Sequence, residues 1–287
     1  MNMSFSHASK NAIPFKIIGG CSWLLLLILF APVIRWFVTT WSTSIYDAHG
    51  ALVPIIVGVM LWSRRRNLAS EPRQPDLAGL WLLGAAVLLL LLAMLMDFNM
   101  LGGVAFIIAV AGMIWTLQGV RWLRAAIFPV SFLLFMLPLN YPLEIFAGFP
   151  LRLLSVKLTA ALLRLTGLEV TVQGTLLATS NFQVAIESPC SGLKTLSALL
   201  MVGLVLSFFL RHRLYERMVL LLLIPVVAVL ANAVRNMAIT LLGHYYGREY
   251  ALGFLHSFSG LAVFLLAVAL LILFSELLLW RRKPAPS

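Results

Sequence analysis

Cys190 is the residue of this chain whose chemical type and setting point most directly to catalysis. It stands in the run Ser188-Pro189-Cys190-Ser191-Gly192, just before a long apolar segment. Serine is a good helix N-cap and proline fits the first helical position, so we expect Cys190 in the first turn of a helix. Backbone N–H groups and the helix dipole there favour the thiolate, the nucleophilic form of cysteine. A small packed cysteine is the structural alternative.

A second polar feature lies inside an apolar segment. Asn232, Arg235 and Asn236 are spaced by three and four residues, which places them on one face of a helix. A charged side chain within a membrane span is costly and by default marks a functional site. Arg235 could stabilise the oxyanion that forms when a thiolate attacks a peptide carbonyl. A structural polar clamp and a guanidinium that reaches the membrane surface are the alternatives.

Two histidines could carry the proton that such a reaction transfers to the leaving amine. His256 opens the last apolar segment, near its polar entrance. His244 stands beside Tyr245 and Tyr246, a pairing typical of the aromatic belt at a membrane surface. His256 is favoured by this position, although the sequence alone separates the two histidines only weakly.

The composition indicates that the elements positioning these residues lie mostly in lipid. Hydrophobic residues make up 62% of the 287 residues and charged residues 11%, and the mean hydropathy is +1.00. A soluble core cannot bury that much apolar surface, so we expect one integral membrane domain over residues 1–287. The net charge of +11 comes from short basic runs beside apolar segments, which is typical of cytoplasmic loops rather than of nucleic-acid binding. No ligand cluster is present, so neither a metal nor a cofactor is expected.

Apolar runs of about 20 residues, the length that crosses a bilayer, predict an all-α polytopic protein of about eight transmembrane helices. Their expected ranges are 17–38, 45–63, 77–96, 100–119, 123–141, 190–210, 217–242 and 253–280. With both termini in the cytoplasm, most basic residues face the cytoplasm, as the positive-inside rule requires. Cys190, Arg235 and His256 then lie at one level, near the outer face of the membrane.

One long outer loop, 142–189, precedes Cys190. The first half of this loop contains three basic residues, Arg152, Lys157 and Arg164. They would make that half a costly ninth span, and a ninth span would turn the basic residues that follow in the sequence outward. An interfacial helix on the outer side fits better. The alternating runs 170–172 and 182–186 in the second half predict a small β-hairpin in water on the same side.

At these residues the chain resembles the exosortase/archaeosortase family of membrane-embedded cysteine transpeptidases. The matching pieces are Pro189-Cys190-Ser191-Gly192-Leu193, then Asn232-Ala-Val-Arg235, then His256 with Gly260. The upstream stretch from Tyr46 to Pro54, followed by Leu61-Trp62 and Arg64-Arg65-Arg66, is similar to the family's second span. The resemblance covers most of the chain in order, and the ordered set is more specific than any one of its short motifs.

The resemblance implies a cysteine protease or transpeptidase that cleaves the C-terminal sorting signal of exported proteins through a thioacyl intermediate. It assigns Cys190 as nucleophile, Arg235 as stabiliser of the substrate carbonyl and His256 as general acid/base. The implied partners are the bilayer and membrane-anchored substrates that end in a short motif such as Pro-Glu-Pro (the PEP-CTERM signal), a transmembrane helix and a basic tail. The implied location is the inner membrane of a Gram-negative bacterium that makes exopolysaccharide, with the site facing the periplasm.

Further residues are expected to line this site or to hold the substrate. Asn232, Asn236, Ser191 and His49 are candidates for lining it, although a structural role is favoured for His49. The three basic residues of the outer loop are expected to receive an acidic recognition residue. The hairpin is expected to pair with the extended motif by strand addition.

Other functions remain compatible with the same residues. A transporter or channel would use Arg235, Asn232 and Asn236 to line a polar pathway, but the chain has no internal repeat and no matched pair of broken helices. A non-enzymatic scaffold for envelope assembly would need Arg235 only for packing. A rhomboid-type serine protease is disfavoured because its GxS motif and partner histidine are absent as a set. For a thioacyl enzyme, water, a lipid amine and a glycan precursor are all compatible acyl acceptors.

Overall fold

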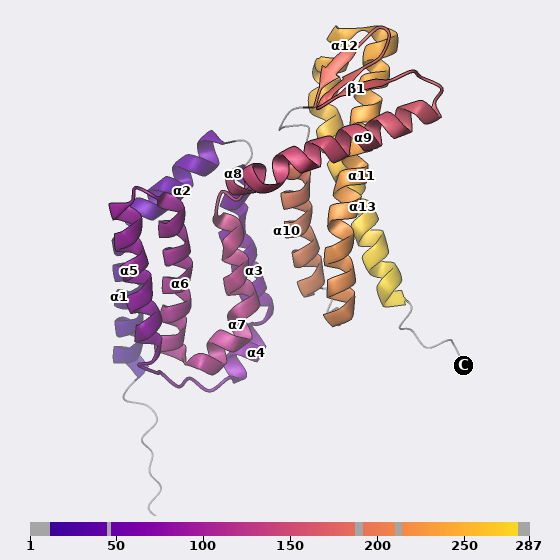
Figure 1. Ribbon diagram of the computed structural model, residues 1–287. Helices are drawn as coiled ribbons and strands as arrows, with labels where there is room; N and C mark the ends of the chain where they lie inside the picture. The colour runs from indigo at the N-terminus through magenta and orange to yellow at the C-terminus, as the bar shows by residue number, and fades with distance from the viewer. Residues whose placement is uncertain (1–11, 45–46, 187–191, 210–213, 281–287) are drawn as a thin grey trace, which may run out of the picture. The chain divides into compact units, whose positions relative to one another are not determined.

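The computed structural model describes residues 12–44, 47–186, 192–209 and 214–280, and these residues are mostly helical (Figure 1). Their contacts divide the chain into two compact units, residues 1–139 and residues 140–287, which are described separately. That the whole chain forms a single integral membrane domain stays a prediction.

The first unit is built from helices alone among its described residues. They are α1 (Ala12–Leu29), α2 (Ala31–Thr43), the 3₁₀ turn η1 (Ala48–Leu52), α3 (Val53–Ser63), α4 (Arg65–Ser70), α5 (Gly79–Leu95), α6 (Asn99–Gln118), α7 (Val120–Phe132) and the 3₁₀ turn η2 (Leu133–Met136). Helices α5 and α6 form a tightly packed hairpin. Their backbones come so close that a Cβ added to Gly112 would lie only 3.0 Å from the backbone nitrogen of Leu83. Asp76 links the start of α5 to the end of α6. Its carboxylate accepts hydrogen bonds from the N–H of Ala78 and the indole of Trp115, and both bonds lower its pKa.

Two predicted spans of the first unit are interrupted in the structure. The range 17–38 falls on α1 and α2, which are bent by 63° relative to each other. Proline stands at the start of α2 and has no N–H with which to continue the hydrogen-bond ladder of α1. The range 123–141 is not one continuous helix either, because α7 ends at Phe132 and continues only as η2. Pro129 in the last turn of α7 likewise removes a backbone donor.

The second unit carries the residues that the sequence singles out. Its elements are α8 (Asn140–Leu143), the π-helical turn η3 (Glu144–Gly148), α9 (Phe149–Leu165), β1 (Thr171–Gln173), β2 (Leu176–Ala178), β3 (Gln183–Ala185), α10 (Leu193–Phe209), α11 (Leu214–Tyr246), α12 (Arg248–Leu252) and α13 (Phe254–Trp280). Helices α10, α11 and α13 contact one another and run side by side, whereas α9 runs crosswise against α11 (Figure 1). Together with η3, α9 is itself long and apolar enough to cross a membrane, so its expected place as an interfacial helix on the outer side stays a prediction.

A three-stranded antiparallel sheet in the order β1-β2-β3 replaces the predicted two-stranded hairpin. Strand β3 falls within the predicted run 182–186 and β1 is shifted by one residue from the predicted run 170–172, but the two strands do not pair with each other. The strand between them, β2, pairs with both, so that Leu177 stands opposite Val172 on one side and Val184 on the other.

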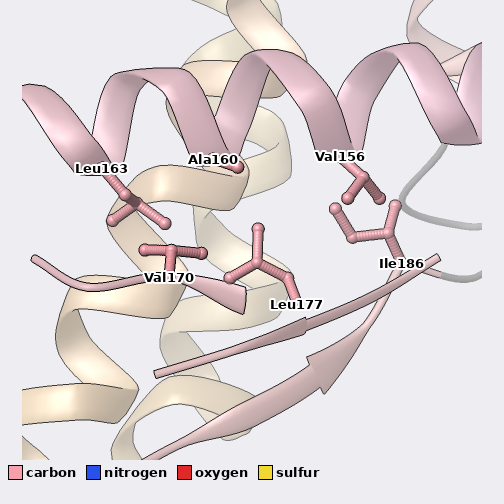
Figure 2. Packing of buried hydrophobic residues seen from close by; sticks show 6 residues of the cluster. All are labelled: Val156, Ala160, Leu163, Val170, Leu177 and Ile186. Atoms are coloured by element: carbon pink, nitrogen blue, oxygen red, sulfur yellow. The ribbon is translucent and has the colours of Figure 1, made fainter. Parts of the chain in front are cut away.

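The sheet is held against α9 by buried aliphatic side chains. Figure 2 shows the side chains that point into this cluster, which are Val156, Ala160 and Leu163 from α9, and Val170, Leu177 and Ile186 from the sheet segment. Met237 and Leu241 of α11 pack against the same cluster. Each fully buried aliphatic side chain contributes about 1.5–3 kcal/mol relative to an exposed one. The cluster therefore fixes α9 and the sheet to the half of α11 that follows Arg235.

By length and composition, four segments of the described residues could cross a membrane. They are Asn99–Gln118, Glu144–Leu165, Tyr215–Tyr246 and Ser259–Leu277, and the bent pair α1 and α2 would make a fifth. Three further apolar segments, Ala48–Ser63, Gly79–Leu95 and Thr195–Phe209, are shorter. The count of eight spans and their orientation therefore stay predictions.

Candidate active site

The polar side chains inside α11 face neighbouring helices of the second unit, and we call Asn232, Arg235 and Asn236 the polar stripe. Asn232 is only 2% exposed, and its Nδ2 donates a hydrogen bond to Ser155 Oγ of α9 at 3.1 Å. One turn further along α9, the hydroxyl of Thr159 donates to the carbonyl of Ala233 at 3.4 Å. Asn236 is also buried, and its carbonyl accepts from Thr240. The bonds of Ser155 and Thr159 tie the crosswise helix α9 to α11 at the polar stripe.

Arg235 turns toward α13. Its Nε donates to Ser259 Oγ at 3.2 Å, and the guanidinium lies against the α13 backbone at Gly260. A Cβ on Gly260 would be 3.6 Å from Arg235 Cζ, which is an ordinary van der Waals contact. The charged end of Arg235 is therefore held at the α11–α13 contact, and the arginine is half-buried.

Gly192 fixes where the chain enters α10. Its φ is +86°, and its carbonyl accepts the N–H of Leu196 at 2.9 Å, the first bond of the helix. A Cβ on Gly192 would be 3.1 Å from Asn232 Cβ and 3.2 Å from Asn232 Cγ. Glycine is needed here both for the left-handed backbone and for this close approach. The entrance of α10 thus lies against Asn232, one helical turn from Arg235.

The start of α10 corrects one sequence prediction. The helix begins at Leu193, and the positive φ of Gly192 separates it from what precedes. The predicted span 190–210 therefore begins three residues later than expected, whereas the expectation that Cys190 occupies the first helical turn, with Ser188 as N-cap, falls outside the described residues and stays a prediction. Cys190 and Ser191 themselves lie outside the described residues.

The two candidate histidines lie on different helices, His244 on α11 and His256 on α13. His256 belongs to α13, and its side chain lies outside the described ones. Its place in the helix is one turn before Ser259, about 4.5 Å along the axis. His244 lies on α11 about 13.5 Å beyond Arg235. The helix positions thus bring the α13 turn of His256, rather than His244, close to Arg235.

His244 has a local role instead. Its Nδ1 lies 3.1 Å from Thr179 Oγ1, at the turn between β2 and β3. The same hydroxyl donates to the carbonyl of Phe182 and accepts the N–H of Phe182. Either the hydroxyl or Nδ1 donates in the contact with His244, depending on the tautomer of the imidazole. His244 therefore fastens the sheet to α11.

The three basic residues of α9 do not form one cluster. Arg152 makes an ion pair with Glu144 and lies over the ring of Phe149. Arg164 donates to the carbonyl of Val170 at 3.2 Å, at the other end of the helix, about 18 Å away along its axis. Lys157 lies between them and is exposed.

The remaining candidate, His49, lies in η1 of the first unit and is half-buried. Its role in lining a site stays a prediction. The neighbouring Gly50 packs against the indole of Trp41, whose Nε1 donates to the carbonyl of Met136. Over the described residues, no group of three or more His, Cys, Asp or Glu side chains could hold a metal ion.

Sequence reasoning missed the serines and threonines that support the polar stripe. Ser155 and Thr159 are spaced by four on α9 and both are fully buried. That spacing puts them on one helical face, a signal that the sequence does contain. Ser259 stands beside the motif glycine Gly260, but no spacing rule pairs a residue of one helix with a partner on another.

The chain matches the model of a known protein family. Residues 41–273 match the family described as "Transmembrane exosortase (Exosortase_EpsH)", a range that contains the polar stripe, Gly192 and Gly260. No curated protein and no solved structure matches the chain. Because the matched range covers most of the 287 residues, the chain belongs to the transmembrane exosortase family of membrane proteins.

Proposed function

We propose that this chain is a cysteine protease or transpeptidase that cleaves the C-terminal sorting signal of exported proteins at the outer face of the inner membrane. The observation that carries the proposal is the contact of Gly192 with Asn232, one turn from Arg235. Only one residue separates Cys190 from Gly192, so covalent geometry limits the distance between their Cα atoms to about 7 Å. A cysteine tethered to Gly192, whose neighbour Asn232 is one helical turn from the partly buried Arg235, would supply the nucleophile, and Arg235 the cation, that acyl transfer requires.

The proposed reaction has two steps through a thioester. The Cys190 thiolate attacks the carbonyl carbon of the scissile peptide bond, and Arg235 stabilises the resulting oxyanion. As the C–N bond breaks, His256 gives its proton to the leaving amine, and the acyl group remains on Cys190. Water or an amine then attacks the thioester, giving its proton back to His256 while the C–S bond breaks and the thiolate is restored.

The choice of His256 as proton carrier rests on helix positions. His256 precedes Ser259 by one turn, and Ser259 is bonded to Arg235. His244 is engaged with Thr179 on the sheet. The bonds of Asn232 to Ser155 and of Arg235 to Ser259 also favour a held catalytic group over the lining of an open transport pathway.

The sheet offers an edge on which an extended substrate motif could form a fourth strand. The backbone N–H and C=O groups along β3 alternate in direction. Those of Phe182, Val184 and Ile186 face β2, so those of Gln183 and Ala185 face outward. Both of these side chains are exposed. Strand β3 ends at Ala185, five residues before Cys190 in the sequence, which favours strand addition at this edge.

A pair of proline substitutions tests this mode of recognition. Ala185→Pro removes an outward N–H from β3, and we expect it to slow processing. Val172→Pro is the matched control. Val172 lies in β1, at the opposite edge of the sheet, and the register of the sheet points its backbone groups away from β2. Equal effects of the two substitutions would count against docking at β3.

The basic residues of α9 are proposed to receive an acidic residue of the motif one at a time rather than together. Arg152 already pairs with Glu144, so an acidic substrate would have to displace that carboxylate. Lys157 is exposed and needs no such exchange. Lys157→Glu should impair processing, whereas unchanged processing would remove this residue from the substrate site.

The function itself is tested by replacing the cysteines in cells that produce an epitope-tagged protein with a motif, transmembrane helix and basic tail. Cys190→Ala and Cys190→Ser should abolish conversion of the tagged precursor. Cys21→Ala is the matched control, because Cys21 is an exposed cysteine of α1. Normal processing by Cys190→Ala, at a normal level of protein in the membrane, would contradict an enzymatic role.

A further inference from the structure

The guanidinium of Arg235 is held by α13, and this contact bears on the proposed reaction. Nε donates to Ser259 Oγ at 3.2 Å, joining the middle of α11 to the first part of α13. A bond to Nε fixes the rotation of the planar guanidinium about its long axis, which a bond to a flexible ammonium group would not do.

Gly260 supports the same arrangement from one face of the guanidinium. Its Cα has no side chain, and a Cβ built there would stand 3.6 Å from both Cζ and Nη2 of Arg235. The guanidinium therefore lies close against the α13 backbone, with room for one methyl group and not for a branched side chain. A hydroxyl at its edge and a glycine against its face together define its position.

The entrance of α10 lies against the same polar stripe of α11, one turn before Arg235. Asn232 is one turn from Arg235 and is fixed between Ser155 and Gly192. Gly192, two residues after Cys190 in the sequence, and the guanidinium of Arg235 thus lie at adjacent turns of one helix. An arginine side chain free to rotate would lose this fixed relation, since its rotamer entropy is about 2 kcal/mol.

We propose that Ser259 is a positioning residue that orients the Arg235 guanidinium toward the carbonyl attacked by Cys190, with Gly260 providing the space. The proposal rests on the function proposed above and adds a residue to which no role has been given. Electrostatic stabilisation of an oxyanion depends on donors that are aligned before the reaction begins. Ser259 supplies that alignment without touching the substrate.

The test is a double-mutant cycle on the full chain in lipid nanodiscs with the tagged substrate. We expect Ser259→Ala to slow processing about tenfold, the effect of losing one charge-assisted hydrogen bond, and Ser259→Thr to restore it. If Ser259 acts through Arg235, Ser259→Ala should add nothing in an Arg235→Lys background. Additive effects of the two substitutions, or failure of Ser259→Thr to restore processing, would overturn the proposal. Gly260→Val should also slow processing, whereas Ser131→Ala, at an exposed serine of α7, is the matched control and should process normally.

A second measurement keeps this proposal separate from the proposed function. In the full chain labelled with ¹⁵N-arginine, the Arg235 Nε–H resonance is identified by its loss in Arg235→Lys. It should be protected from solvent exchange in the native protein and unprotected in Ser259→Ala. Equal exchange in the two proteins would refute the anchoring of Arg235 whatever Cys190 does. Protection by Ser259 together with normal processing by Cys190→Ala would refute the proposed reaction, and with it any positioning role.

Discussion

Replacement of Gly192 by alanine tests the geometry on which the site depends. The alanine would have to adopt a φ of +86°, which costs an L-residue about 1–2 kcal/mol, and its Cβ meets a neighbour as well. It would also stand 3.1 Å from Asn232 Cβ, a crowded contact whose relief costs about 1–3 kcal/mol. The sum is about 2–5 kcal/mol. If this cost is met by moving the entrance of α10 away from Asn232, processing should fall by at least about 30-fold.

The assay is a pulse-chase measurement of precursor conversion, with the thermal unfolding midpoint measured on the purified variant. Gly167→Ala is the matched control, because Gly167 has a φ of +84° and a Cβ added there would meet no atom within 4 Å. It should lose about 1–2 kcal/mol of stability and keep most of its processing. The reasoning is refuted if Gly192→Ala processes as fast as Gly167→Ala.

Three further outcomes are expected. His256→Ala should abolish processing and His244→Ala should retain most of it, measured by immunoblot at equal protein levels; the reverse order would reassign the proton carrier. A membrane-impermeant maleimide added to intact spheroplasts should label Cys190 and not Cys21, and labelling of Cys21 alone would invert the predicted topology. The pKa of Asp76 is held below its ordinary value of 3.8, so its contribution to stability is present above that pH and is lost as pH falls through the lower folded value. The difference in unfolding midpoint between wild type and Asp76→Asn should therefore shrink below pH 3.8, and a difference that grows there would contradict the assignment.

The parts of the fold that could be predicted from the sequence are those with a simple apolar pattern. Helices α5 and α6 start and end within two residues of the predicted spans, because their apolar runs are continuous and bounded by polar or turn residues. Strands β1 and β3 followed from alternation. The strand between them was missed because Leu176-Leu177-Ala178 does not alternate, and its pairing depends on two neighbours rather than on its own pattern.

The breaks in the helices were harder to predict, since a proline inside an apolar run is compatible with either a kink or a continuous span. The bend after Leu29 and the end of α7 both lie close to such a proline, Pro32 and Pro129, within runs that stay apolar.

For the site, the sequence identified the polar stripe because spacing within one helix is a local property. Its partners are not local. Ser155 reaches Asn232 across 77 positions of the chain and Ser259 reaches Arg235 across 24, distances over which no periodicity operates. The left-handed conformation of Gly192 also escaped prediction, because the preceding Ser188-Pro189 pair is itself a typical start of a helix.

The central claim is that Cys190 forms a thioester with the exported substrate, and trapping that intermediate tests it most directly. Hydroxylamine added during processing should release the substrate with a hydroxamate at its new C-terminus, detected by mass spectrometry, and Cys190→Ala should give none. A hydroxamate formed equally well by Cys190→Ala, or a substrate cleaved by wild type with no hydroxylamine-sensitive adduct on the Cys190 peptide, would contradict the account.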